Sequence, residues 1–259
     1  MTSADATEAA SAKDWPRFPN APIVEAVLDI QASFAHPPEV GRLAMFHEHI
    51  RDRYPAMEPR VSWEFDFQVV EGGPRQGLKR GPEGFGFKSS TGQRLLQVRQ
   101  NGLTLNWLKP YDTWAAFRDE ARPHWERYCD LYHPESVTRL GLRYVNRIDL
   151  PLPFKDFREY VKTAPDIATG LPQGLSNFLF RIEIPDAERG LTAILTETMQ
   201  PLLGTETKRL PFIFDIDIVC GRTLPPSGPS LWDMFEQMRD YKNEIFFLSV
   251  TDRARELFR

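Results

Sequence analysis

The stretch RLGLRYVNRIDLP, residues 139–151, has the side-chain alternation of a β-strand. A strand sends successive side chains to opposite faces of a sheet, so its residues divide into two rows. One row is apolar except for an asparagine and consists of Leu140, Leu142, Tyr144, Asn146, Ile148 and Leu150. The other row carries three arginines and consists of Arg139, Gly141, Arg143, Val145, Arg147 and Asp149. The stretch therefore predicts a strand with one face in a core and one charged face.

The residues before this strand predict a first group of elements. Alternation and helical spacing indicate a strand over 22–34, a helix over 37–54, a strand over 61–70 and a helix over 111–132. Between them, turn signals separate three more strands near 84–90, 94–100 and 102–108, and the pair Asn101-Gly102 is a strong hairpin signal. The glycine-rich residues 71–84 are typical of a loop.

The residues from 136 onward repeat this order of elements. A strand over 136–150 is followed by a short helix near 154–162 and by strands near 175–184, 190–199 and 208–221. A long helix then carries an apolar stripe made of Leu231, Met234, Phe235, Met238 and Tyr241. Thr251 is a candidate N-cap for a last short helix.

These two groups predict an α+β fold with two topologically repeated halves of the form β-α-β(3-4)-α. We expect antiparallel sheets gripped by long helices, an arrangement that resembles helix-grip, TATA-binding-protein-like folds and implies no function by itself. The expected organisation is a disordered N-terminal tail over 1–19, a first half over 20–133 and a second half over 134–259.

Composition narrows the class of protein. The chain has 259 residues, a formal net charge of −4 and two cysteines far apart in the sequence, Cys129 and Cys220. The charge argues against a protein that coats nucleic acid, and the cysteine spacing favours a reduced, cytoplasmic protein. No apolar run approaches the roughly 20 residues that span a bilayer, and no secretory signal is recognisable. We therefore expect a soluble cytoplasmic protein that does not bind membranes.

Four segments resemble a sporadically distributed family of functionally uncharacterised prokaryotic proteins. They are PIVEAVLDI (22–30), LKPYDTW (108–114), RLGLRYVNRIDLP (139–151) and KNEIFFLSVTDRARELF (242–258). The resemblance implies a stand-alone soluble protein of about this length, and it implies no catalytic residue and no cofactor.

The arginine row has two interpretations. In the structural one, Arg143 and Arg147 form cross-strand ion pairs, which are mildly stabilising, with acids on neighbouring strands. The candidate acids are Glu25, Asp29, Asp215 and Asp217. In the functional one, the planar guanidinium groups of the two arginines hold an anionic ligand or an acidic peptide.

Two further residue patterns could carry function. Asn146 interrupts the apolar row, so its amide is expected to bond backbone at an irregularity of the sheet or to face a ligand. Asp215 and Asp217 lie two apart on one strand face and could hold Mg²⁺, although spacing supplies no third carboxylate.

These patterns predict a non-catalytic binding protein that recognises a protein partner or a small anionic ligand through a curved antiparallel sheet. The first alternative is a metal-dependent enzyme that acts on a phosphorylated substrate, and the second is a nucleic-acid binder. Acidic residues on the polar strand faces, such as Glu64 and Asp66, disfavour the nucleic-acid binder. No nucleophile motif, phosphate loop or metal-binding motif is present in the sequence.

Overall fold

A computed structural model describes residues 15–70, 73–175, 177–199 and 208–259, with side chains outside 62–80 and 82. Of the predicted tail, residues 1–14 therefore lie outside the described residues. The end of that predicted tail packs on the body of the protein, because Trp15 stacks on Phe247 with 5.3 Å between ring centroids and Phe18 contacts Phe258 edge-on.

Nine strands of the described residues form one sheet in which every pairing is antiparallel. The order across the sheet is β2-β3-β4-β5-β1-β6-β9-β8-β7. The strands are β1 (Ile23–Ser33), β2 (Ala56–Val70), β3 (Gly73–Lys88), β4 (Arg94–Arg99), β5 (Gly102–Leu108), β6 (Ser136–Pro151), β7 (Leu179–Asp186), β8 (Leu191–Met199) and β9 (Arg209–Cys220). The mixed α+β fold with antiparallel strands is thus as predicted.

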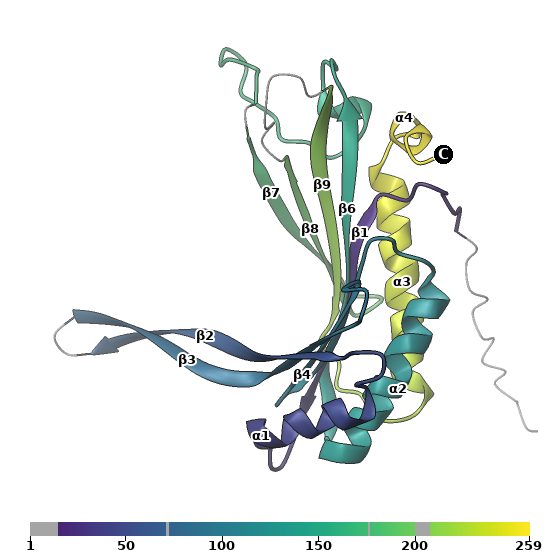
Figure 1. Cartoon of the computed structure of the whole chain (residues 1–259). Coiled ribbons are helices and arrows are strands. Elements are labelled where there is room, and N and C mark those ends of the chain that lie inside the picture. Colours follow the sequence, from purple (N-terminus) through teal and green to yellow (C-terminus); the bar gives the residue numbers. More distant parts are fainter. Residues whose placement is uncertain (1–14, 71–72, 176, 200–207) are drawn as a thin grey trace, which may run out of the picture.

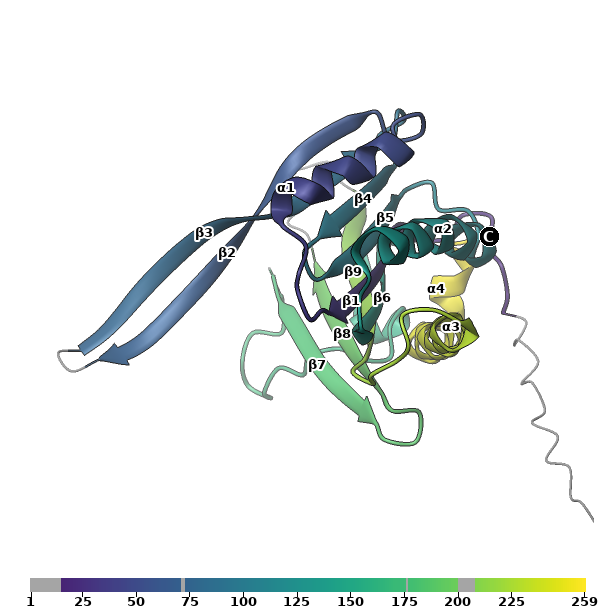
Figure 2. The same cartoon turned by 90° about the horizontal axis from the view of Figure 1, so that it is seen from below.

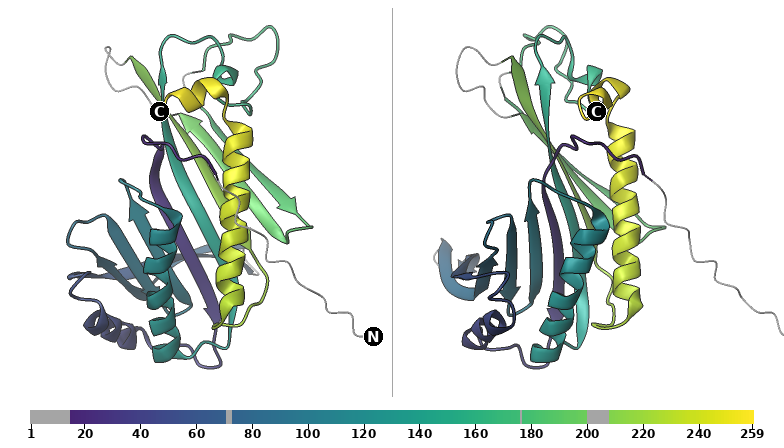
Figure 3. Two further views of the ribbon diagram at one scale, coloured as in Figure 1. Left: turned by 90° about the vertical axis from the view of Figure 1, so that its right-hand side faces the viewer. Right: turned by 45° about the vertical axis from the view of Figure 1, so that its right-hand side comes forward.

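Two long helices cover one face of this sheet (Figures 1 and 3). They are α2 (Trp114–Tyr132), which packs on β5, and α3 (Pro229–Ser249), which packs on β6 and β9. The short helices are α1 (Val40–Leu43), η1 (Ala44–His49), η2 (Phe157–Glu159) and α4 (Asp252–Glu256). We call the sheet face that lies away from α2 and α3 the open face. No helix in the described part of the chain is long and apolar enough to cross a membrane.

The strand from the opening stretch, β6, lies at the centre of the sheet and pairs with β1 and β9. Its apolar row faces the helices, and all six of its members are buried, at 0–2% exposure: Leu140, Leu142, Tyr144, Asn146, Ile148 and Leu150. The prediction that this row lies in the core is confirmed. Because β6 also joins the two groups of predicted elements, all nine strands share one sheet.

Two predicted elements are wrong. Residues 73–84 are not a loop, because β3 begins at Gly73 and pairs with β2 along its whole length, from Val70↔Gly73 to Ala56↔Lys88. Glycine and proline weaken a strand, but β2 supplies a long partner of high β-propensity, and cross-strand pairing is invisible to local periodicity. The resulting hairpin extends far from the sheet, away from α2 and α3 (Figures 1 and 2). The expected helix over 37–54 is limited to α1 and η1, because the chain turns after His49.

Candidate functional site

The arginines of the open face are already paired with the sheet's own acids. Arg143 binds Asp215 with two nitrogens, at 2.9 Å from Nε to Oδ1 and 2.6 Å from Nη2 to Oδ2. The Asp215 side chain is only 11% exposed, whereas that of Arg143 is 48% exposed. The predicted ion pair of Arg143 is thus confirmed, and it raises the pKa of Arg143.

Arg147 does not reach any of the four predicted acids. Its Nε donates to Asp149 on its own strand at 3.0 Å, and both side chains are more than 40% exposed. The reason is the register between β6 and β9. Asp215 lies opposite Val145, two residues after Arg143, so Arg143 reaches it diagonally. The residue two positions after Arg147 lies opposite Pro211, which has no charge. The prediction for the partner of Arg147 is therefore wrong, although the residue is paired.

The remaining acids of the open face are held by neighbouring strands. Asp29 accepts hydrogen bonds of 2.6, 2.9, 2.6 and 3.2 Å from four side chains, those of Arg99, Arg139, Thr104 and Gln31. Glu25 accepts from Asn106 Nδ2 at 2.7 Å. This part of the open face is a network of cross-strand contacts, as the structural interpretation requires, although no described residue accepts from the buried Nε of Arg99.

Asp217 differs from the other three acids, because it makes no ion pair shorter than 4.0 Å with any described residue. Burial raises its pKa, and the charges of Arg139 and Arg143 partly oppose that effect. Among the described residues no group of three or more His, Cys, Asp or Glu could hold a metal ion. Since Arg143 also occupies both oxygens of Asp215, the magnesium interpretation gains no support from the described geometry.

A cavity of about 600 Å³ lies on the other side of the sheet, and we call it the helix-side cavity. Its walls come from the segment 15–23, from the residues that start α2, from β6 and from α3. Figure 3 shows the N-terminal segment passing beside α3. Side chains of residues 15–18 and 21–23 in this segment line the cavity. Aromatic rings form much of the lining, namely those of Trp15, Phe18, Tyr111, Trp114, Tyr144, Phe246 and Phe247.

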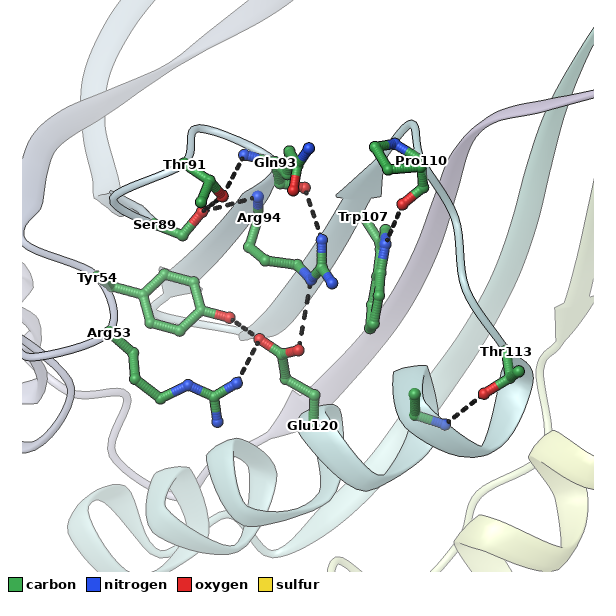
Figure 4. A network of polar contacts seen from close by, with 11 residues as sticks. Arg53, Tyr54, Ser89, Thr91, Gln93, Arg94, Trp107, Pro110, Thr113 and Glu120 are labelled. Atoms are coloured by element: carbon green, nitrogen blue, oxygen red, sulfur yellow. Dashed lines mark hydrogen bonds and ion pairs between the residues drawn. The ribbon is translucent and has the colours of Figure 1, made fainter.

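The start of α2, which forms one wall of this cavity, is fixed by a polar network that Figure 4 shows. Glu120 on α2 accepts from Tyr54 Oη at 2.6 Å and from Arg94 Nε at 3.4 Å. The guanidinium of Arg94 lies over the ring of Trp107, whose indole N–H donates to the carbonyl of Pro110 at 3.0 Å. Because these contacts hold β4, β5 and α2 together, Tyr111 and Trp114 are presented from a fixed support.

The most unusual side chain of the cavity is Lys242 on α3. It is 8% exposed, and its ammonium nitrogen lies 3.9 Å from the centre of the Tyr144 ring. It forms no ion pair within 4.0 Å with a carboxylate of the described residues. Burial and, to a smaller extent, the positive charge of Arg239 together lower the pKa of Lys242 to about 7. The negative face of the Tyr144 ring acts in the opposite direction, because it attracts the charged form.

Two tyrosines lie beside this amine and stay protonated at neutral pH. The hydroxyls of Tyr111 and Tyr144 are 2.9 Å apart and share a hydrogen bond. Burial raises the pKa of both phenols well above the ordinary value of 10. The two hydroxyls carry two hydrogens and use one of them for each other, so one hydrogen remains for another acceptor.

The charges around the cavity are unequal. Its lining contains four basic side chains, Arg17, Arg118, Arg239 and Lys242, and two acidic ones, Asp112 and Glu236. Glu236 is shared by two donors, with Arg118 Nη1 at 2.6 Å and the indole N–H of Trp114 at 2.8 Å. Glu236, which lies on α3, is thus occupied. Basic side chains outnumber acidic ones in the lining by two, and one of them, Arg239, also pairs with Asp240 at 2.8 Å.

Asn146 is the one predicted site residue that lines the helix-side cavity. Its Nδ2 donates to the carbonyl of Phe214 on β9 at 2.9 Å. It also pairs with Ile23 at the point where the register of β1 and β6 shifts. The predicted role of bonding backbone at a sheet irregularity is confirmed, and the same residue is placed where it can face a ligand.

The structure therefore separates the predicted residues. Arg143, Arg147, Glu25, Asp29, Asp215 and Asp217 lie on the open face, and Asn146 lies on the opposite side. Sequence reasoning missed Lys242, although a signal exists: it lies four residues after Met238 and three before Ile245, on the apolar stripe of α3. A lysine at such a position buries at least its alkyl stem, and its ammonium group either reaches water or is buried with it.

Neither a protein-family model nor a curated protein matches this sequence.

Proposed function

We propose that this chain is a non-catalytic binding protein that holds a small anionic ligand in the helix-side cavity, with Lys242 as its anchor. The observation that supports the proposal is a buried ammonium group that faces a cavity and has no carboxylate partner among the described residues. A buried charge is costly unless it is paired, so structural lysines of this kind are rare. A ligand anion would supply the missing partner.

The rest of the cavity suits such a ligand. Binding sites for small molecules are concave and mostly apolar, with a few polar groups that orient the ligand. The aromatic lining provides the apolar contacts, and the surplus of basic groups provides the attraction for negative charge. A cavity of about 600 Å³ accommodates a molecule with one aromatic ring and one acidic group.

The open face is a weaker candidate for the anion. A ligand there would have to displace Asp215 from Arg143 or Asp29 from Arg99 and Arg139. A protein partner remains the second candidate for that face, and the observation that favours it is the long projecting hairpin of β2 and β3 (Figure 1). The metal-dependent enzyme and the nucleic-acid binder have no comparable support.

We also infer that the two halves, residues 20–133 and 134–259, form a topological repeat of the helix-grip type. The strand order supports this inference, because β5, β4, β3 and β2 follow β1 outward while β9, β8 and β7 follow β6 outward in the other direction. Each half ends in a long helix, α2 or α3. The cytoplasmic location and the lack of a cofactor stay predictions.

A thermal-shift experiment tests the anion site. Benzoate and phenyl phosphate are compared with benzamide, a neutral molecule of similar shape. A ligand at about ten times its Kd stabilises the folded state by about 1.4 kcal/mol, which raises the Tm of a protein of this size by about 3 °C. We expect a shift with at least one of the two anions and none with benzamide.

Two variants locate the site. Lys242→Met should abolish the shift, whereas Arg143→Met, which removes a guanidinium from the open face, should keep it. The opposite pattern would move the anion site to the open face, and equal shifts with benzamide would show that charge plays no part.

A further inference from the structure

We propose that Lys242 forms a reversible covalent imine with an aldehyde or ketone that carries a negatively charged group and binds in the helix-side cavity. This inference rests on the proposed anion site and names its ligand class as an oxo acid or an anionic aldehyde. It adds a covalent step that anion binding alone does not require.

The first requirement is an amine with a free electron pair, because only the neutral form attacks a carbonyl group. Lys242 is buried beside a cavity, with no carboxylate of the described residues within 4.0 Å to keep it charged. Arg239, one helical turn before it on α3, lines the same cavity and disfavours a second positive charge. Burial and this neighbour lower the pKa of Lys242 to about 7, so a large fraction of the amine is neutral at physiological pH.

The second requirement is a source of protons at the place of reaction. The Tyr144 ring lies under the amine at 3.9 Å, and its hydroxyl is hydrogen-bonded to that of Tyr111. Both phenols are protonated because burial raises their pKa, and one of their two hydrogens is not used in the mutual bond. The pair can therefore donate to an oxygen that gains negative charge.

The reaction balances without an oxidant or a reductant. The lone pair of Lys242 Nζ attacks the carbonyl carbon, the C–N bond forms, and the π electrons of the carbonyl move to its oxygen. That oxygen takes one proton from the nitrogen and a second from the tyrosine pair. The C–O bond then breaks, and water leaves. Loss of the last proton on nitrogen returns the proton of the tyrosines, so the net change is the release of one water molecule.

The third requirement is selectivity for a ligand with a negative charge. The basic side chains of the lining attract a carboxylate or phosphate group of the ligand.

Reductive trapping on the full-length protein tests the inference. Pyruvate and phenylglyoxylate are the carbonyl probes, and lactate and mandelate are their matched hydroxy acids. Each is incubated with the protein near neutral pH in the presence of sodium cyanoborohydride, which reduces an imine to a stable amine. Intact mass spectrometry and peptide mapping then identify the modified residue. We expect one adduct per chain, on Lys242, with at least one oxo acid and no adduct with the hydroxy acids.

The variant Lys242→Arg keeps the positive charge and removes the nucleophilic amine, so it should lose the adduct and retain the thermal shift by mandelate or benzoate. If this variant does not fold, peptide mapping of the trapped wild-type protein shows whether Lys242 is the modified residue. Labelling confined to exposed lysines such as Lys109 and Lys155 would overturn the covalent step.

The two proposals fail in different ways. If the oxo acids and hydroxy acids raise the Tm equally and no adduct forms, the imine is refuted and the anion site stands. If none of the anions raises the Tm and no adduct forms on Lys242, both proposals are refuted.

Discussion

Replacing Lys242 with methionine should make the protein more stable. Methionine has a similar length and no charge, so it fills the same space beside Tyr144 without requiring a buried ammonium group. A lysine that costs stability at a core position is expected where binding, and not folding, requires it. The variant therefore connects the stability of the fold with the function of the helix-side cavity.

The size of the effect follows from the protonation of Lys242. Its pKa is lowered from 10.5 to about 7, which corresponds to about 5 kcal/mol of free energy against the charged form, since one pKa unit equals about 1.4 kcal/mol. We expect Lys242→Met to raise the free energy of unfolding by up to about 5 kcal/mol below pH 7, where the lysine is charged in both states.

The effect should depend on pH with a defined sign. Between about pH 7 and pH 10.5 the lysine is protonated in the unfolded state and neutral in the folded state. The unfolded state then binds more protons, so the stability of the wild type rises with pH by up to about 1.4 kcal/mol per pH unit relative to the variant. The phenols that face the amine, Tyr111 and Tyr144, do not titrate in most of this range because burial raises their pKa.

Urea unfolding at about pH 6 and about pH 9 measures both quantities. The variant should be more stable at the lower pH, and its advantage should shrink by at least about 2 kcal/mol at the higher pH. Lys109→Met is the control, because Lys109 is exposed and should show neither effect. If Lys242→Met is less stable than the wild type at both pH values, or if the difference does not change with pH, the account of a buried, unpaired lysine is refuted.

Three further predictions concern the sheet. Arg143→Met should lower the free energy of unfolding by about 2 kcal/mol, because it leaves the nearly buried Asp215 unpaired. Arg147→Met breaks an exposed pair and should change the free energy of unfolding by less than about 0.5 kcal/mol. Urea unfolding of both variants measures this contrast, and equal losses would contradict it. Burial raises the pKa of Glu197 from 4.5 to about 7, so the folded state holds an extra proton in this range and the wild type should lose stability as pH rises from about 4.5 to 7. Glu197→Gln should remove that loss, and unchanged pH dependence of its Tm would show that this carboxyl does not titrate there. Asn146→Leu removes a hydrogen bond to a buried backbone carbonyl and should cost about 1–2 kcal/mol in the same urea assay. An unchanged free energy of unfolding would contradict a structural role for this amide.

Local patterns in the sequence predict the elements of this fold well where each element has a strong period of its own. The alternation of residues 139–151 predicts a strand, and its apolar row is buried as expected. The long helices are predicted because apolar residues at helical spacing persist over several turns. Residues 73–84 show the limit of prediction from local patterns. Their own composition indicates a loop, but pairing with β2 makes them part of a strand.

The candidate site shows the same division between local and non-local information. The alternation placed Arg143 and Arg147 on one face, but their partners depend on the register between β6 and β9, which leaves Asp215 diagonal to one arginine and Pro211 diagonal to the other. Lys242 was recognisable as a charge on an apolar stripe. The sequence did not show that Lys242 lacks a carboxylate partner among the described residues, because this depends on the side chains that surround it from α2, β6 and the N-terminal segment.

The spacing of side chains along the chain thus predicts the elements with a strong period, the two faces of the central strand and the α+β class. The packing of distant segments sets which charges neutralise one another. It also leaves Lys242 beside a cavity without a carboxylate partner among the described residues. Electrostatic energies depend on distances of a few ångströms and on burial, and both are set by segments far apart in the sequence.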